Sequence, residues 1–206
     1  TSEDGKKFYK KTNLSEEVIV GPTESMSKSK KNTIDPESII KNYGADSVRL
    51  FILSDSPPEK DVQWSDQGML ASFKFIQKLW NLNLKIKEKI NMNYIEDTDG
   101  EIKKFTNKFL KRVTENLENF NYNKIVANLH EMYSFLFKQL DRDYKKETLY
   151  ENYEKILIAI TPVVPHFSSE CLQLLNSKEK RWPKYDENEL QENLSLIHIS
   201  EPTRRS

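Results

Sequence analysis

The chain has 206 residues, and its 32 Lys plus Arg balance its 32 Asp plus Glu, so no global field favours a nucleic-acid partner. Hydrophobic residues make up 36% and charged residues 31%, which is typical of a soluble chain with one large or two small domains. Apolar runs such as ILIAITPVV at 156–164 are too short to cross a bilayer, and the single cysteine, Cys171, excludes an internal disulfide and favours a reducing, cytoplasmic compartment.

Two short strands are predicted at the start of the sequence. DGKKFYKK at 4–11 combines a turn with an alternating pattern, and EEVIVG at 16–21 ends at a Gly-Pro pair. Because Thr1 leads almost directly into this pattern, we expect a fragment whose true start lies upstream. With the helices that follow, these strands predict a short α/β segment.

The next stretch, ESMSKSKKN at 24–32, holds three serines and three lysines with little to bury. A solvated linker is one interpretation. The other is a polyphosphate site, because ammonium groups neutralise charge on a leaving pyrophosphate while hydroxyls and backbone amides position its oxygens. Composition alone leaves both open.

A helix is predicted from Pro36 to Tyr43, with Asp35 as its N-cap and Gly44 at its left-handed exit. ADSVRLFILS at 45–54 is either a second short helix or a buried strand, since periodicity over so few residues cannot decide.

The segment 45–54 contains a possible ion pair, and two prolines follow it. Asp46 and Arg49 are three residues apart and could pair, in a role that supports the loop rather than the chemistry. Pro57 and Pro58 then exclude a helix.

From Ser65 onward the apolar period is that of long helices. Stripes recur over 76–90, 102–120, 125–140 and 146–160, and a short fifth helix ends near Leu175. Each stripe needs an apolar partner, so residues from about 65 to 175 are predicted to form a bundle of four or five helices.

Several charged and titratable side chains in this region can be explained by structural roles. A basic face at near-helical spacing is typical of a solvated surface; it consists of Lys104, Lys108, Lys111 and Arg112. His130 and His166 have no cysteine or histidine partner at metal spacing, so structural roles are favoured and no metal site is predicted.

Residue order narrows the choice for the lysine-rich stretch. SMSKS at 25–29, followed by KKN, resembles the KMSKS signature of class I aminoacyl-tRNA synthetases, with Ser25 where lysine is usual. The continuation TIDPESIIKNYGADSVRLF resembles the Leu/Ile/Val/Met branch of that class. SDSPPEKDVQWSDQG at 54–68, TPVVPHFSSECLQLL at 161–175 and WPKYDENEL at 182–190 are similar to the leucyl-tRNA synthetase family.

This resemblance implies a mainly α fold. Residues 1–64 correspond to the end of a class I nucleotide-binding catalytic domain, a short α/β remnant, and residues 65–193 to an α-helical bundle of the anticodon-binding type. The whole enzyme would activate leucine with ATP to leucyl-adenylate and transfer leucine to its tRNA. The isolated chain, which lacks the upstream signature, the amino-acid pocket and the editing domain, would be inactive.

The resemblance also implies residue roles. Lys28 matches the second lysine of the signature and is the candidate catalytic residue, and the ATP-binding loop comprises Ser25, Met26, Ser27, Lys28 and Ser29. The basic face becomes a candidate for contact with tRNA. Mg²⁺ would accompany ATP, with no ligands in this chain, and the full-length enzyme would be a cytoplasmic monomer without a membrane partner.

Two questions remain at this stage. LSLIHISEPTRRS, residues 194–206, fits neither the helical period nor the family pattern and is similar to translated sequencing-adapter sequence, so a non-native tail is expected. The alternatives are a stand-alone RNA-binding or helical interaction module, which would have no need of the lysine-rich stretch, and a valyl, isoleucyl or methionyl relative.

Overall fold

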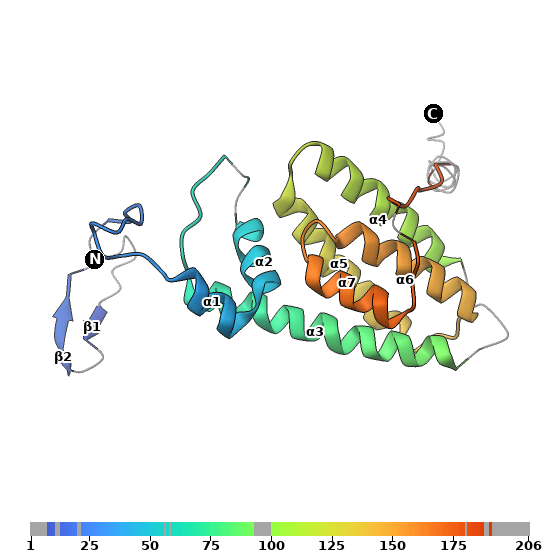
Figure 1. Cartoon of the computed structure of the whole chain (residues 1–206), viewed down its shortest axis with the longest axis horizontal. Helices are drawn as coiled ribbons and strands as arrows, with labels where there is room; N and C mark the ends of the chain where they lie inside the picture. Colours follow the sequence, from blue (N-terminus) through green and yellow to red (C-terminus); the bar gives the residue numbers. More distant parts are fainter. Residues whose placement is uncertain are drawn as a thin grey trace, which may run out of the picture. The chain divides into compact units, whose positions relative to one another are not determined.

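The computed structural model describes residues 8–10, 13–19, 22–55, 57, 59–92, 100–179, 181–187 and 190, and this part of the chain is mainly α, as predicted (Figure 1). Its elements, in chain order, are β1 (Phe8–Lys10), β2 (Asn13–Val18), α1 (Pro36–Tyr43), α2 (Ala45–Asp55), α3 (Asp66–Asn91), α4 (Glu101–Glu118), α5 (Tyr122–Gln139), α6 (Lys146–Ile160) and α7 (Pro165–Leu174). The chain divides into two compact units, Thr1–Ser38 and Ile39–Ser206.

In the described residues of the first unit, two strands pair antiparallel. Phe8 of β1 pairs with Val18 of β2, and the register is irregular between Tyr9 and Lys10. An α/β layer needs parallel strands joined by crossover segments, whereas the sheet of the described residues holds β1 and β2 alone. The predicted α/β remnant is therefore not seen in the described part of the chain.

The helix predicted from Pro36 to Tyr43 is confirmed as α1. The carboxylate of Asp35 accepts hydrogen bonds from the backbone N–H of Glu37 at 3.3 Å and of Ser38 at 3.1 Å, so this side chain caps the helix. Gly44 ends the helix with a φ of 80°, a left-handed conformation that glycine adopts without steric cost.

The ambiguous segment that follows is a helix, α2. Asp46 and Ser47 are buried together with Leu50 and Phe51, which is the spacing of one helical face and not the alternation of a strand. That face packs against α3, α5 and α7. Tertiary contacts with these helices therefore decide what periodicity over ten residues could not.

The helices α3 to α7 of the second unit form the predicted bundle. Ser65 caps α3 by accepting a hydrogen bond from the N–H of Gly68 at 3.1 Å, and α3 then runs along the other helices (Figure 1). The apolar stripes meet in one core, which includes Leu79, Leu82, Ile86, Ile102, Leu110, Val113, Ile125, Leu129, Leu136, Ile156, Leu157 and Ile160. No helix in the described residues is long and apolar enough to cross a membrane.

A buried polar pair joins α3 to α6 within this core. Asn83 of α3 is 0% exposed, and its Oδ1 accepts a hydrogen bond from the hydroxyl of Tyr153 of α6 at 3.0 Å. Burial raises the pKa of Tyr153 well above its usual value, so the phenol stays a donor. This bond fixes the register of α6 on α3, because a slip of either helix would leave two buried polar groups unpaired.

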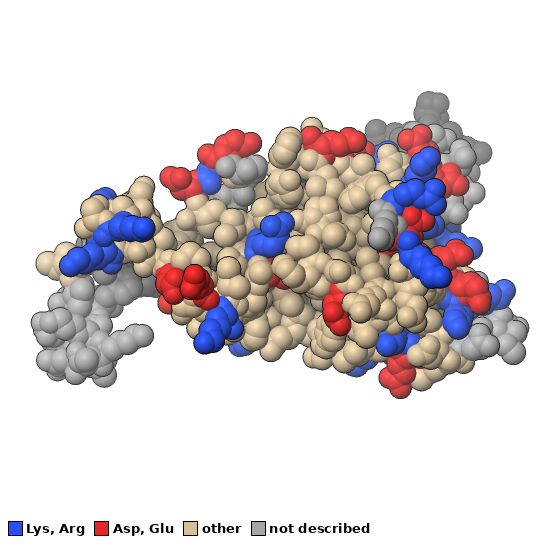
Figure 2. Space-filling model, viewed as in Figure 1, with Lys and Arg blue, Asp and Glu red and all other residues tan. Residues whose placement is uncertain are grey.

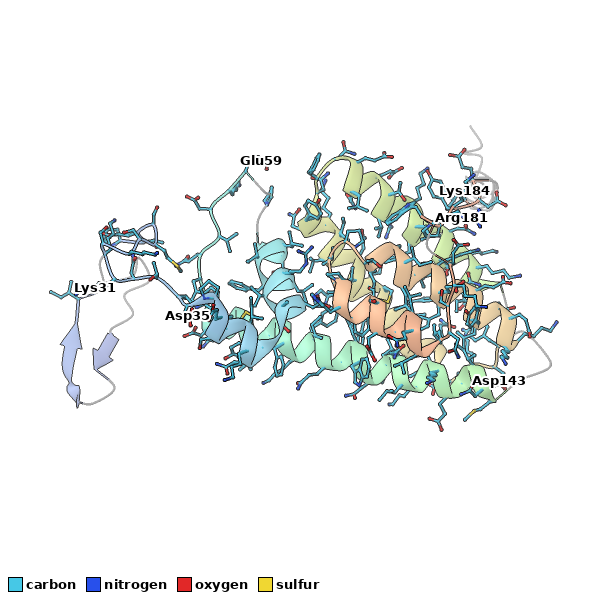
Figure 3. All side chains as sticks on the ribbon, in the orientation of Figure 1. Lys31, Asp35, Glu59, Asp143, Arg181 and Lys184 are labelled. Carbon is cyan, nitrogen blue, oxygen red and sulfur yellow. The ribbon has the colours of Figure 1, made fainter. Side chains whose placement is uncertain are left out.

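The segment after α7 lies along α4. The indole of Trp182 donates to the hydroxyl of Thr114 at 3.0 Å, and the N–H of Asp186 donates to the side-chain oxygen of Asn107 at 2.9 Å. Arg181 and Lys184 mark this segment in Figure 3. The stretch 194–206, predicted to be a non-native tail, lies outside the described residues.

The thiol of Cys171 is expected to be inert in the folded chain. Cys171 is 0% exposed, and burial, aided by the nearby Glu170 carboxylate, raises its pKa to about 12. Because the thiolate is the reactive form, a thiol reagent at neutral pH should label the native chain at least about a hundredfold more slowly than the chain unfolded in guanidinium. Fast labelling without denaturant would show that α7 opens readily.

Candidate functional site

The lysine-rich stretch forms a tight loop in the first unit. A turn covers residues 28–31, with the N–H of Lys31 donating to the carbonyl of Lys28 at 3.2 Å. Lys31 has a φ of 53°, an uncommon left-handed conformation for a lysine. The loop is thus a defined turn and not an extended linker.

Two serine hydroxyls lie together inside this turn. The Oγ atoms of Ser27 and Ser29 are 3.1 Å apart, and the N–H of Lys30 donates to the Oγ of Ser27 at 3.3 Å. The structure therefore brings together two of the residues predicted for phosphate contact. Hydroxyls and backbone N–H groups grouped in a turn are the donors that phosphate oxygens accept from.

The side-chain amide of Asn32 closes the loop. Its Oδ1 accepts from the N–H of Ser27 at 2.8 Å, and its Nδ2 donates to the carbonyl of Ser25 at 3.3 Å. Sequence analysis did not single out this residue. The only available signal was its residue type, because asparagine is common in turns where its side chain can bond to nearby backbone.

The three lysines of the loop differ in their electrostatic surroundings. Lys30 forms an ion pair with Glu24, with Nζ and Oε2 2.8 Å apart. Lys28 is exposed and makes no ion pair with any residue that the structure describes, and Lys31 extends away from the loop (Figure 3). Positive charge gathers over the loop in Figure 2. Lys28 and Lys31 therefore keep positive charge available to an anion, and of these two lysines Lys28 lies within the SMSKS stretch.

Ser25 and Met26 are the remaining residues of the predicted ATP-binding loop. Met26 is 47% exposed. The loop has no buried apolar side chain among its described residues 22–32, so its shape depends on the hydrogen bonds described above. Glu24, Ser25 and Met26 lead into the turn as an exposed segment.

The predicted basic face lies on α4 in the second unit, but its four members are not equivalent. Arg112 pairs with Glu131 of α5 at 2.8 Å, and Lys111 pairs with Glu115 one turn along at 3.9 Å. Lys104 and Lys108 are exposed and have no ion pair within the described residues. The available positive charge is thus at the N-terminal half of α4.

Asp46 and Arg49 could pair along α2, but instead Asp46 binds the start of α7 and Arg49 binds the turn between α6 and α7. The carboxylate of Asp46 accepts from the N–H groups of His166 at 3.3 Å and Phe167 at 2.6 Å, and lies 2.9 Å from His166 Nδ1. The guanidinium of Arg49 donates to the carbonyl of Pro162 at 2.7 Å and of Val163 at 3.3 Å. We call these contacts the α2 clamp.

A cleft of about 690 Å³ lies beside the α2 clamp. Its wall is largely aromatic and apolar, with Tyr43, Ile76, Trp80 and Phe167, and its polar groups include Asp46 and His166. The Asp46 carboxylate already accepts hydrogen bonds from the start of α7. The acidic group of the cleft is therefore already engaged in holding the start of α7.

The two histidines that sequence analysis assigned to structure have packing partners. His130 stacks on Phe75 with ring centroids 3.9 Å apart, and burial, together with the charge of Lys78, lowers its pKa. His166 belongs to the α2 clamp. Among the described residues, no group of three or more His, Cys, Asp or Glu side chains is placed to hold a metal ion.

Comparison with protein families gives two matches along the chain. Residues 99–204 match the model for the anticodon-binding domain of tRNA ligase, which is more than half of the chain. The chain belongs to this family. Residues 4–65 match the model for class I tRNA synthetases of the I, L, M and V group, and this range includes the lysine-rich loop.

Curated relatives of this chain include leucine-tRNA ligases. The enzyme of Orientia tsutsugamushi (strain Boryong) is 41% identical over 184 residues, covering 85% of this chain and 21% of the relative. That of Bartonella quintana (strain Toulouse) is 37% identical over 196 residues, covering 89% and 22%. The predicted resemblance to leucyl-tRNA synthetases is confirmed, and the chain spans about a fifth of the length of these relatives.

A solved structure has the same fold. It is the ternary complex LeuRS-tRNA-LeuAMS of Agrobacterium radiobacter K84 agnB2, with a TM-score of 0.70, 21% sequence identity, and coverage of 81% of this chain and 23% of that chain. At this identity the likeness establishes the fold alone.

Proposed function

We propose that this chain is the part of a leucine-tRNA ligase that carries the pyrophosphate-binding loop and the anticodon-binding helices. The observation that carries the proposal is the similarity to leucine-tRNA ligases over 85% of the chain, with family matches over both the loop and the bundle. Residues 1–64 form the end of the class I catalytic domain, and residues 65–193 form the helical domain. The substrates are leucine, ATP and the tRNA for leucine, and the full-length ligase is a cytoplasmic monomer.

In the activation step, a carboxylate oxygen of leucine attacks the α-phosphorus of ATP, and the bond from that phosphorus to the bridging oxygen of pyrophosphate breaks. Lys28 neutralises the negative charge that grows on the departing pyrophosphate, since its ammonium is exposed and has no carboxylate partner among the described residues. Ser27 and Ser29 hold the turn and offer hydroxyls to phosphate oxygens. Mg²⁺ would shield the ATP phosphates, and no residue of this chain is assigned to it, because the described residues supply no cluster of metal ligands.

Amino-acid-dependent exchange of pyrophosphate into ATP tests this proposal in the full-length ligase. Exchange is expected with leucine. It should be at least about a hundredfold weaker with valine, isoleucine or methionine, because the amino-acid pocket discriminates between side chains. The isolated chain, added as a control, should support no exchange with any amino acid. Preferred exchange with valine, isoleucine or methionine would assign the chain to another enzyme of this group, and absence of exchange with all four would exclude the ligase proposal.

The basic face on α4 is proposed to contact the tRNA backbone through Lys104 and Lys108, with weaker contributions from Lys111 and Arg112. The double variant Lys104→Ala/Lys108→Ala should weaken tRNA binding about tenfold. The slope of the logarithm of the binding constant against the logarithm of salt concentration should become shallower by about two, one for each lost phosphate contact. Leucine activation should be unchanged, because it needs no tRNA. Binding measured by titration at several salt concentrations checks both effects.

A matched pair of lysines controls for loss of charge alone. Lys74 and Lys78 are exposed on α3 with the same spacing of four residues. If Lys74→Ala/Lys78→Ala weakens binding as much as the α4 variant, the attraction is general and the α4 face has no special contact. If neither pair matters, the tRNA lies elsewhere.

A further inference from the structure

The loop that carries Lys28 is closed by a single side chain. Both polar atoms of the Asn32 amide are used within the loop: Oδ1 accepts from the N–H of Ser27, and Nδ2 donates to the carbonyl of Ser25. These two bonds tie residue 32 to the segment just before Lys28. The bond from the N–H of Lys31 to the carbonyl of Lys28 fixes the segment just after it.

The loop needs such a tie because its charges oppose closure. Lys28, Lys30 and Lys31 place three like charges within four residues, and among the described residues only Lys30 has a carboxylate partner, Glu24. The described residues 22–32 contain no buried apolar side chain that would hold the turn by packing. The left-handed φ of Lys31 adds a modest cost to the closed form.

We propose that Asn32 is a positioning residue for Lys28: its side-chain amide holds the turn in which the Lys28 ammonium is placed for the departing pyrophosphate. This inference rests on the proposed function, since it assigns Lys28 to that charge. Charge stabilisation is effective when the donor is already in position, so it is lost when the donor must be ordered during the reaction. Asn32 itself need not touch ATP.

Single-turnover kinetics of the full-length ligase test the inference. Asn32→Ala should slow formation of leucyl-adenylate by about tenfold to a hundredfold, the cost typical of a misplaced catalytic group. Transfer of leucine from preformed leucyl-adenylate to tRNA releases no pyrophosphate and should stay within about twofold of wild type. Asn42→Ala, which changes an exposed asparagine on α1, is the matched control and should leave both steps unchanged.

A double-mutant cycle with Lys28→Ala separates positioning from a merely structural role. If Asn32 acts through Lys28, adding Asn32→Ala to Lys28→Ala should cause less than about a twofold further loss. Independent, multiplicative losses would overturn the inference, and so would equal losses in activation and transfer. Asn32→Gln, which keeps both polar groups but moves them by one methylene, should show an intermediate loss and serves if the alanine variant does not fold.

The outcomes also distinguish this inference from the proposed function. If Lys28→Ala slows activation and Asn32→Ala does not, the role of Lys28 stands and the role of Asn32 is overturned. If Lys28→Ala leaves activation unchanged, the assignment of Lys28 fails and the inference fails with it. Leucine-dependent pyrophosphate exchange by the wild type would still identify the ligase in either case.

Discussion

Lys28→Ala in the full-length ligase is expected to lower the rate of leucine activation by on the order of a hundredfold, the usual cost of removing one charge-stabilising donor. The effect should be larger on turnover than on ATP binding, because in the proposed role Lys28 meets negative charge that grows only as pyrophosphate departs. Lys28 is suited to this role because it is exposed at the turn and has no carboxylate partner among the described residues.

The transfer step provides an internal control for this variant. Transfer from preformed leucyl-adenylate involves no pyrophosphate, so Lys28→Ala should change its rate by less than about threefold. Lys28→Arg should restore activation partly, since it returns the charge but not the compact ammonium. Equal losses in the two steps would show that Lys28 supports the fold or the tRNA instead.

Lys31→Gly is a matched control for the charge of the loop. It removes a neighbouring ammonium, and glycine readily adopts the φ of 53° found at this position, so the turn should be preserved. The loss of activation should be much smaller than for Lys28→Ala. A comparable loss would mean that the loop attracts phosphate by its total charge and that position 28 is not special.

Most of the helical fold could be predicted from local signals. Asp35, Pro36 and Gly44 specify both ends of α1, and each has the predicted place in the structure. The long helices carry apolar stripes over several turns, which is enough to fix their period. For the ten-residue segment that became α2, the local pattern was too short, and contacts with α3, α5 and α7 decided its conformation.

The candidate site was predictable as a set of residues but not as a geometry. Residue order made Lys28 and its neighbouring serines the candidates, because the resemblance extends through their flanks. The closure of the loop by Asn32 depends on hydrogen bonds to residues five and seven positions away, which no periodicity encodes. The partial neutralisation of the α4 face by Glu131 of α5 likewise follows only from how two helices pack.

The α2 clamp could likewise not be predicted from the sequence, and it should contribute to the stability of the fold. Asp46 and Arg49 are spaced to pair along one helix, yet their partners lie more than a hundred residues away, at the start of α7 and in the turn before it. Val164, the N-cap residue of α7, makes no side-chain cap bond, and Asp46 fills that role from another helix. Arg49 meanwhile binds carbonyl groups that follow α6.

The α2 clamp also joins parts that match different family models. Asp46 and Arg49 belong to the class I synthetase match at 4–65, and the turn that they bind belongs to the anticodon-binding match at 99–204. The boundary between the two matched families is therefore bridged by charge-assisted hydrogen bonds, of which the bond from Phe167 to Asp46 is buried. Loss of these bonds should loosen α2 and α7 together.

Asp46→Ala is accordingly expected to lower the free energy of unfolding of the chain by about 3 kcal/mol, from a lost helix cap and lost charge-assisted hydrogen bonds. The Asp46 side chain is 8% exposed, so water cannot readily replace it at the N–H groups of His166 and Phe167. Asp46→Asn keeps one acceptor oxygen and should cost about 1 kcal/mol. Guanidinium unfolding of the three chains measures both differences.

Asp61→Ala is the matched control, because Asp61 is exposed and lies outside the helices. Its expected effect is within about 0.5 kcal/mol, as for most surface substitutions. If Asp46→Ala has an effect as small as this control, then α7 is capped adequately without α2. If Asp46→Asn costs as much as Asp46→Ala, the negative charge of the carboxylate, and not its capacity as an acceptor, holds the start of α7 against α2.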